Sequence, residues 1–195
     1  MKTLLLMRHA KSSWRHAEMP DHERPLNKRG NKDAPLIGSL IKEKELVPQT
    51  ILCSTALRAT ETSRMVQEKS GFTGEAIFLD SYYLAEPNAY LEGLQTLPDE
   101  IERVLVIGHN PGLEGLLQIL SGEIVPLSTG AVAHLVLPIN HWNELNLDSD
   151  GELVETFSPH DLKEKEKKGK EKEKEKEKEK EKEKEKSKQR SKKKK

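Results

Sequence analysis

The amino-acid sequence predicts an α/β fold, in which short strands alternate with helices along the chain. Uninterrupted apolar runs, such as LLLM at 4–7 and VLVI at 104–107, are typical of strands buried on both faces of a mostly parallel sheet. Between these runs lie longer stretches in which apolar residues recur at helical spacing. The alternation indicates crossover connections, in which a helix joins one strand to the next.

The first half of the chain contains three predicted strands and two predicted helices. The strands are expected over 2–7, 50–53 and 76–79, and the helices over 27–45 and 56–69. In the first helix, Ala34, Ile37 and Ile41 lie on helical spacing, although Pro35 must then lie within its first turns. Gly71 follows the second helix, and glycine commonly ends a helix.

The second half contributes two predicted helices and four predicted strands. The helices are expected over 87–97 and 112–120, and the strands over 103–107, 131–137, 145–147 and 153–157. Gly108 ends the first of these strands, and Pro111 stands where the next helix begins, a position that suits proline. His109 is therefore predicted to lie on a strand-to-helix turn.

The net charge of zero conceals two oppositely charged parts of the chain. Residues 161–195 contain 19 Lys and Arg and 11 Asp and Glu, a net of +8, which leaves 14 and 22, a net of −8, in residues 1–160. No apolar residue follows Leu162, so the Lys/Glu repeats cannot offset the entropy of ordering. We expect one folded domain at 1–160 and a disordered, charged C-terminal tail at 161–195. The tail is either an inert extension or a weak electrostatic contact for RNA, an anionic membrane or an acidic partner.

Cysteine content and the lengths of the apolar runs bear on cellular location. Cys53 is the single cysteine, so no internal disulfide can form, and the cytoplasm is the expected compartment. The opening MKTLLLM resembles a secretory signal, but its apolar run is shorter than the roughly 7–15 residues that a signal needs. No run is long enough to predict a transmembrane segment.

Cationic side chains follow three of the predicted strands. Arg8 and His9 end the first strand, His109 follows a later one, and another strand leads through a short turn to Arg58. Ligands of open α/β sheets bind outside the carboxyl ends of the strands, so these four side chains are expected to face one crevice. Two guanidiniums and two imidazoles favour an anion such as phosphate. A His9 kept neutral by the arginines is then placed to attack phosphorus in line.

Four motifs in one order resemble the histidine phosphatase superfamily, which has a phosphoglycerate-mutase-like fold. They are LLLMRHAKSSW at 4–14, which is similar to the RHG or RHA signature, RPLNKRG at 24–30, STALRATET at 54–62 and VIGHNPGLEGL at 106–116. The resemblance extends over about residues 1–160 and is nearest to the SixA-like phosphohistidine phosphatases. It implies a three-layer αβα sandwich with a mostly parallel central sheet, and an enzyme that uses no metal and no other cofactor.

The resemblance also implies roles for individual residues. His9 is the residue that becomes phosphorylated during turnover, Arg8 and Arg58 bind its phosphate, and His109 completes the pocket as a second catalytic residue. The backbone amide of Asn110 is expected to add a donor to the phosphate. The implied substrate is a phosphohistidine on a signalling protein or, alternatively, a small phosphoester.

Two further residues are expected at the edge of the site. Arg24, in RPLNKRG, is placed near the mouth of the pocket with a structural or substrate-binding role. Larger members of the family use a glutamate as general acid, and the candidate here is Glu86, in a polar stretch that favours a solvated carboxylate. Without such an acid, the pattern suits a leaving group that departs unaided, such as protonated phosphohistidine. Segments 12–24 and 80–90 are expected to form the pocket wall. Lys11 and Trp14 have no assigned role.

The segment from Cys53 to Arg58 also invites comparison with a cysteine-dependent phosphatase. Four residues separate Cys53 from Arg58, one fewer than the loop of such an enzyme requires. Cys53 also ends an apolar run, which predicts a buried and inert thiol.

A zinc site and a binding module compete with the interpretation as a phosphatase. The candidate zinc ligands His9, His16, His22 and His109 lack helical HxxxH spacing and a cysteine partner, and neighbouring arginines disfavour a cation. A module that binds a phosphorylated partner without turnover stays open as a second hypothesis. The presence of the histidine nucleophile, both arginines and the second histidine favours an enzyme.

Overall fold

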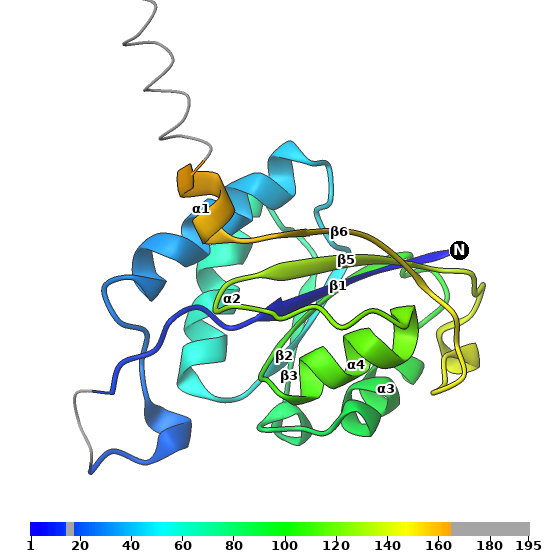
Figure 1. Cartoon of the computed structure of the whole chain (residues 1–195), viewed down its shortest axis with the longest axis horizontal. Helices are drawn as coiled ribbons and strands as arrows, with labels where there is room; N and C mark the ends of the chain where they lie inside the picture. Colours follow the sequence, from blue (N-terminus) through cyan, green and yellow to red (C-terminus); the bar gives the residue numbers. More distant parts are fainter. Residues whose placement is uncertain (15–17, 165–195) are drawn as a thin grey trace, which may run out of the picture. The chain divides into compact units, whose positions relative to one another are not determined.

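Strands and helices alternate along most of the chain in the computed structural model, which describes residues 1–14 and 18–164 (Figure 1). The order is β1 (Lys2–Arg8), α1 (Gly30–Glu43), β2 (Thr50–Ser54), α2 (Leu57–Ser70), β3 (Glu75–Leu79), α3 (Pro87–Gln95), β4 (Arg103–Gly108), α4 (Gly112–Ser121), β5 (Val132–Leu137) and β6 (Glu152–Phe157). Short 3-10 turns lie at Asp21–Glu23, Asp80–Tyr82 and Trp142–Glu144. The α/β fold predicted from the sequence is confirmed.

The six strands form one mixed sheet in the order β3-β2-β4-β1-β5-β6. The pairs from β3 to β1 are parallel, whereas β5 is antiparallel to both β1 and β6, so the predicted mostly parallel sheet is only partly correct. The reason lies in the segment between α4 and β5. Its Leu127 N–H donates to Glu114 Oε1 in the first turn of α4 at 2.7 Å, which shows that the chain returns along α4 before β5 starts. The strand therefore begins at the carboxyl end of β1 and runs the opposite way.

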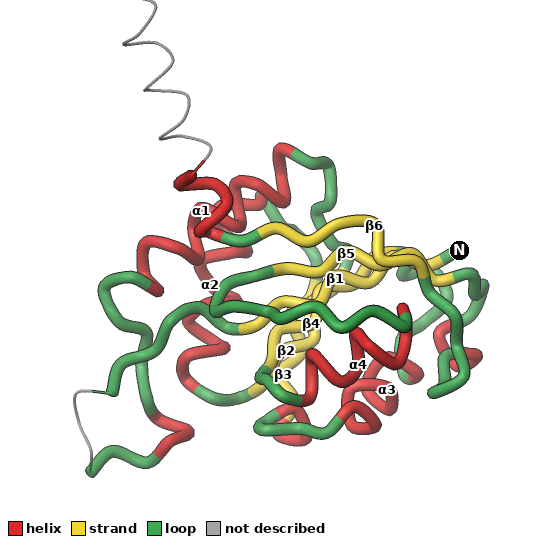
Figure 2. The backbone as a smooth tube through the Cα atoms, viewed as in Figure 1, coloured by secondary structure: helices red, strands yellow, loops and turns green. Residues whose placement is uncertain are grey.

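Helices cover both faces of the sheet, as a three-layer sandwich requires (Figure 2). Leu4 and Leu6 of β1 belong to a fully buried apolar cluster that also contains Leu91 of α3 and Leu117 of α4. Because side chains alternate along a strand, Leu5 and its alternate neighbours face the other way, where α1 and α2 pack. Burial on both faces explains the continuous apolar run of β1.

Strand register brings the predicted site residues to one edge of the sheet. Arg8, the last residue of β1, is paired with Gly108, the last residue of β4, and Cys53 of β2 is paired with Ile107 of β4. The residues that follow these strands therefore emerge side by side. Gly108 is required here, because any side chain on it would collide with the ring of Tyr90.

The largest differences from the sequence prediction are a missing strand and the start of the first helix. The segment 145–147 is a loop and not a strand, because Asn146, Asp148 and Ser149 bond to one another's backbone and side-chain groups, which competes with strand pairing. The helix α1 begins at Gly30 and not at 27, because the Asn27 side chain accepts the backbone N–H groups of residues 29 and 30 and so precedes the first turn.

The C-terminal unit begins at His160, and residues 160–164 are helical. Beyond residue 164, the predicted disordered tail lies outside the described residues. The electrostatic contacts predicted for it lie outside them as well. Within the described ranges, no helix combines the length and apolar character needed to cross a membrane.

Candidate active site

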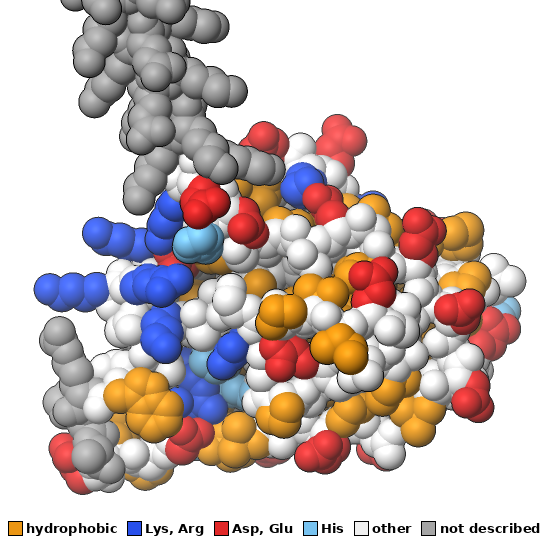
Figure 3. All heavy atoms as spheres, in the orientation of Figure 1, with side chains coloured by type: hydrophobic (Ala, Val, Ile, Leu, Met, Phe, Trp, Pro, Cys, Tyr) orange, Lys and Arg blue, Asp and Glu red, His pale blue; other side chains and the backbone are white. Residues whose placement is uncertain are grey.

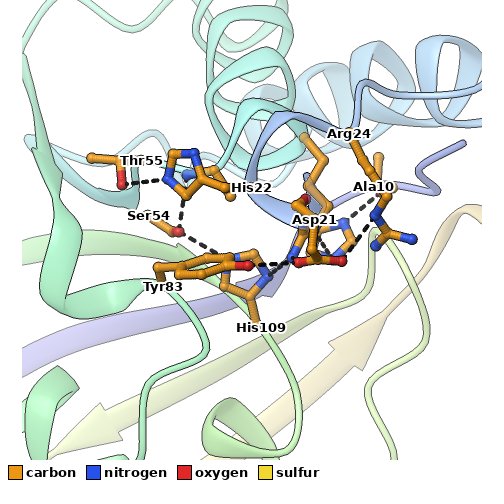
Figure 4. A network of polar contacts seen from close by, with 11 residues as sticks. Ala10, Asp21, His22, Arg24, Ser54, Thr55, Tyr83 and His109 are labelled. Atoms are coloured by element: carbon orange, nitrogen blue, oxygen red, sulfur yellow. Dashed lines mark hydrogen bonds and ion pairs between the residues drawn. The ribbon is translucent and has the colours of Figure 1, made fainter. Parts of the chain in front are cut away.

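Four side chains that follow or end three neighbouring strands are joined by hydrogen bonds, and Figure 4 shows Ser54 and His109 within this network. His9 follows β1, Ser54 ends β2, Arg58 lies in the first turn of α2, and His109 follows β4. Each of the four is buried, with exposed fractions between 0 and 8%. We call this group the pocket floor. The structure thus brings together three of the four residues predicted to face one crevice and adds Ser54, which the sequence did not single out.

Hydrogen bonds fix the tautomer of His9. Its Nδ1 lies 2.7 Å from the carbonyl oxygen of Ala10, which can only accept, so Nδ1 carries the proton. The lone pair is then on Nε2, which accepts from Nε of Arg58 at 3.2 Å. The backbone is held as well, since the His9 N–H donates to Gly108 O at 3.1 Å. His9 therefore presents a neutral, nucleophilic Nε2 toward the guanidinium of Arg58.

The tautomer of His109 follows from the same argument. Its Nδ1 lies 3.4 Å from Nη2 of Arg58, which can only donate, so the proton resides on Nε2. That Nε2–H donates to Ser54 Oγ at 2.8 Å. The Tyr90 hydroxyl accepts the His109 backbone N–H at 3.1 Å. The ring is thus oriented from two directions, and its centroid lies 5.1 Å from that of His9.

The electrostatics of the pocket floor favour neutral imidazoles. Burial, above all, and then the charges of Arg58, Arg8 and Arg24 lower the pKa of His9 to about 4, against the Ala10 hydrogen bond, which raises it. Burial and the neighbouring His9 and Arg58 lower the pKa of His109 to about 3. Both rings are unprotonated at neutral pH, so the nucleophile does not have to lose a proton before it attacks.

A second layer of polar side chains covers the pocket floor, and its members come from segments 12–24 and 80–90, which were expected to form the pocket wall. The Asp21 carboxylate lies 3.0 Å from Arg58 Nη2, 3.0 Å from Arg24 Nε and 2.8 Å from the Tyr83 hydroxyl, which donates to it. The guanidinium of Arg24 lies over the ring of Trp14, 3.4 Å from its centroid. We call Trp14, Asp21, Arg24 and Tyr83 the pocket rim. The predicted position of Arg24 at the mouth agrees with this arrangement.

The Asp21 carboxylate is ionised and sits on the arginines that would receive a phosphate. Partial burial acts to raise its pKa, but the Tyr83 hydroxyl and the guanidiniums of Arg58 and Arg24 outweigh that effect and hold the pKa below its usual value. Burial and the hydrogen bond to Asp21 raise the pKa of Tyr83. Asp21 and Tyr83 lie in the segments expected to form the pocket wall, but neither is assigned a role from the sequence, because their contact depends on two loops that meet only in the folded chain.

Arg8 and Asn110 share one anchor at the side of the pocket. Arg8 Nη1 and Asn110 Nδ2 each donate to the carbonyl oxygen of Leu127 at 2.9 Å. The Nε of Arg8 and the Oδ1 of Asn110 are buried without a hydrogen-bond partner among the described residues. A buried guanidinium with an unused donor is poised to bind an anion.

The remaining predicted residues lie outside this network. Glu86 is exposed at the start of α3 and forms no hydrogen bond or ion pair with a pocket residue within the described ranges. Cys53 is fully buried, and burial raises the pKa of its thiol, as expected for an inert cysteine. His22 Nε2 lies 3.0 Å from Thr55 Oγ1 at the edge of the pocket. His16, the last of the four candidate zinc ligands, lies outside the described residues, and among the described ones no three His, Cys, Asp or Glu side chains converge on a metal position.

Sequence comparisons identify a matching family and relatives of this chain. Residues 4–80 match the family model of the histidine phosphatase superfamily, branch 1. An uncharacterized chloroplastic protein of Arabidopsis thaliana is 35% identical over 153 residues, which cover 73% of this chain and 70% of the relative.

Comparison with solved structures points the same way. The protein histidine phosphatase SixA in complex with tungstate is 26% identical, with a TM-score of 0.70, and the match covers 82% of this chain and 99% of that one. A SixA structure from Agrobacterium tumefaciens is 27% identical, with a TM-score of 0.69, and covers 81% and 98%.

Proposed function

Because the chain belongs to the histidine phosphatase superfamily, in its SixA-like branch, we propose that it hydrolyses phosphohistidine on a protein through a phosphohistidine intermediate on His9. The observation that carries the proposal is the state of His9. Its Nδ1–H is fixed by Ala10, which leaves the Nε2 lone pair directed at the guanidinium of Arg58, 3.2 Å away. A phosphoryl group bound by that guanidinium lies against the nucleophile.

The first step transfers the phosphoryl group to the enzyme. The Nε2 lone pair of His9 forms a bond to phosphorus while the bond from phosphorus to the leaving group breaks. Arg58, Arg8 and Arg24 neutralise the equatorial oxygens, and the Asp21 carboxylate gives up its contacts with Arg58 and Arg24 to the incoming phosphate. The tungstate bound to a SixA relative is an oxyanion of the kind that these arginines suit.

The second step returns the enzyme to its resting state. Water attacks phosphorus, the bond to His9 Nε2 breaks, and inorganic phosphate leaves while His9 regains its lone pair. His109 stays neutral because its pKa is lowered to about 3, and its unprotonated Nδ1 lies 3.4 Å from Nη2 of Arg58, so it acts by orienting the guanidinium that binds the phosphate. The hydrogen bond from its Nε2–H to Ser54 Oγ holds the ring in this tautomer.

The substrate class follows from the acids available. The Asp21 carboxyl has a lowered pKa and is ionised, and Glu86 is exposed at the start of α3, outside the hydrogen-bond network of the pocket floor among the described residues. An alkoxide leaving group needs a protonated acid beside it, because the pKa of the alcohol that it forms is high. The imidazole of a phosphohistidine protonated on its second nitrogen departs as a neutral ring. Phosphohistidine therefore suits this site better than an alkyl phosphoester does.

Trapping of the intermediate tests the reaction. We expect a labelled phosphohistidine peptide to leave an acid-labile, alkali-stable phosphoryl group on the quenched enzyme, and His9→Ala to abolish it. His141→Ala is the matched control, because His141 is exposed and bound to Asp99, outside the pocket. Label that persists in His9→Ala would contradict the assignment of the nucleophile.

A substrate panel tests the class. Phosphohistidine peptide, an aryl phosphate and an alkyl phosphate are compared by kcat/KM, which measures transition-state binding. We expect kcat/KM to be higher for the peptide and for the aryl phosphate than for the alkyl phosphate. A preference for alkyl phosphates would favour a small-molecule phosphatase, and binding without turnover would favour a binding module. The cytoplasmic location and the division at residue 160 stay predictions.

A further inference from the structure

A second cavity, of about 610 Å³, opens next to the pocket rim. Segment 11–14, which follows the nucleophile His9, forms one wall, and segment 25–31, which follows Arg24, forms the other. We call this cavity the lateral cleft. It lies outside the network that holds the phosphate site.

Backbone pairing fixes the two walls of the lateral cleft. Ser12 and Leu26 form an antiparallel bridge. The Ser13 N–H donates to Pro25 O at 2.8 Å, and the Asn27 N–H donates to Lys11 O at 2.9 Å. The cleft is therefore a preformed feature of the fold and not a gap between two unconnected loops.

One side chain connects the lateral cleft to the active site. Trp14 lines the cleft and covers the guanidinium of Arg24, which in turn forms an ion pair with Asp21 above the pocket floor. Trp14 is therefore shared by the lateral cleft and the polar network around the pocket floor.

The lateral cleft is cationic on an acidic domain. Lys11, Lys28 and Arg29 line it, and none of the described residues in its lining is acidic. Arg29 is paired with Asp33, whose side chain is fully buried, and the Lys11 and Lys28 side chains are exposed. Figure 3 shows Lys and Arg side chains gathered on this side of the molecule, although residues 1–160 carry a net charge of −8. The positive charge is thus concentrated next to the active site.

We propose that the lateral cleft binds the carboxylates of an acidic segment next to the phosphohistidine of the substrate protein, an inference that rests on the proposed function. Lysine heads are mobile point charges, which suit several carboxylates along a chain better than one fixed oxyanion. Trp14 is 73% exposed and supplies the aromatic surface that is enriched at protein interfaces. The cleft thereby selects a protein substrate over a small phosphoester, which reaches only the pocket floor.

The distribution of charge also indicates that an acidic peptide, and not a nucleic acid, is the ligand of the cleft. Within residues 1–160, a nucleic acid extends its phosphates beyond the cleft onto a surface whose net charge of −8 repels it. The net charge of +8 on residues 161–195 is the same in every cleft variant, so it does not affect comparisons between variants. A short acidic segment places its charge within the cleft alone. The surface therefore favours the peptide.

A comparison of two peptide substrates tests, in the full-length chain, whether the lateral cleft binds acidic residues. Two phosphohistidine peptides that differ only in Glu or Ala flanks are compared at low salt. We expect kcat/KM to be about tenfold higher for the Glu peptide, through KM, and the preference to fall as salt screens the charges. In Lys11→Gln/Lys28→Gln the preference drops below about twofold, while turnover of an aryl phosphate is unchanged.

Lys42→Gln/Lys69→Gln is the matched control, because it removes the same charge outside the cleft lining. The proposal is overturned if wild type shows no preference, if the preference survives in Lys11→Gln/Lys28→Gln, or if the control loses it equally.

A binding assay separates failure of the cleft from failure of the proposed function. Trp14 is exposed in the cleft whereas Trp142 is fully buried, so tryptophan emission reports an unphosphorylated Glu-rich peptide binding there. We expect the emission change to require about fivefold more peptide in Lys11→Gln/Lys28→Gln. If phosphohistidine peptides are not hydrolysed but the emission change behaves in this way, the proposed function fails and the cleft stands. The cleft is overturned if the peptide leaves the emission unchanged, or if a single-stranded oligonucleotide changes the emission at a lower concentration than the peptide and Lys11→Gln/Lys28→Gln weakens that binding.

Discussion

The pocket floor and the pocket rim surround the same proposed phosphate site, but they are held in place in different ways. The pocket floor is attached to paired backbone: His9 follows β1, His109 follows β4, and the two strands are hydrogen-bonded to each other. The pocket rim comes from loops, and its side chains are held mainly by contacts with one another. Asp21 forms an ion pair with Arg24 and accepts a hydrogen bond from Tyr83. Groups fixed by a sheet keep their geometry when a ligand arrives, whereas groups fixed by one another rearrange. We therefore expect floor substitutions to change the chemical step and rim substitutions to change binding.

Removing the guanidinium of Arg58 should give the largest effect among the arginines and serines of the site. Arg58→Met removes the donor to both imidazoles and to the phosphate, and kcat/KM for an aryl phosphate should fall about 10²–10³-fold. Arg64→Met, an exposed arginine on the same helix, is the control. A loss of less than tenfold would show that the floor does not depend on this guanidinium.

Acid titration should separate the floor histidines from ordinary ones. Because burial lowers the pKa of His9 to about 4, at pH 4.5 its neutral fraction should be roughly seventyfold above that of a histidine with the usual pKa of about 6.5. NMR of the ring protons measures this. The unfolded chain takes up these protons first, so the free energy of unfolding should fall as the pH drops from about 6.5 toward 4. A midpoint near 6.5 would contradict the neutral floor.

Ser54 tests how much the orientation of His109 contributes. Ser54→Ala removes the acceptor of the His109 Nε2–H at 2.8 Å, so kcat should fall about tenfold with little change in KM. Ser54→Thr retains a hydroxyl and should recover part of the activity. Ser39→Ala is the control, since its hydroxyl bonds only to Pro35 O on an exposed helix face. A change confined to KM would place Ser54 in binding.

Asp21 tests the rim. Asp21→Asn removes the carboxylate charge that competes with phosphate for Arg58 and Arg24, so the inhibition constant of tungstate should decrease about threefold to tenfold while kcat changes little. Glu23→Gln makes the same charge change at an exposed position of the same loop and should have no effect. Weaker tungstate binding in Asp21→Asn would show that the carboxylate positions the arginines and does not compete with the anion.

Cys53 should give the smallest effect. Cys53→Ala leaves the phosphate site intact, so kcat/KM should stay within about twofold, and the loss of a buried side chain should cost about 1 kcal/mol of unfolding free energy. A thiol reagent at neutral pH should not inactivate the folded enzyme, because burial raises the pKa of the thiol. Inactivation that Cys53→Ala prevents would bring the cysteine into the site.

The sequence alone determined the class of fold and three of the four residues of the floor, His9, Arg58 and His109. Apolar runs ending in Arg8-His9 and in Gly108-His109 are local patterns, and parallel strands that end in this way must deliver their next residues to one edge. The position of Arg58 at this edge could be predicted in the same way, because only a short turn separates Arg58 from the end of β2.

Tertiary structure decided the rim, the lateral cleft and the direction of β5. Asp21 meets Tyr83 across 62 positions of sequence, and Trp14 meets Arg24 only because two loops pair at Ser12 and Leu26. The reversal of β5 depends on where the chain travels after α4, which no local pattern specifies. Periodicity reports which face of an element is buried, whereas contacts between loops depend on the position of the whole chain.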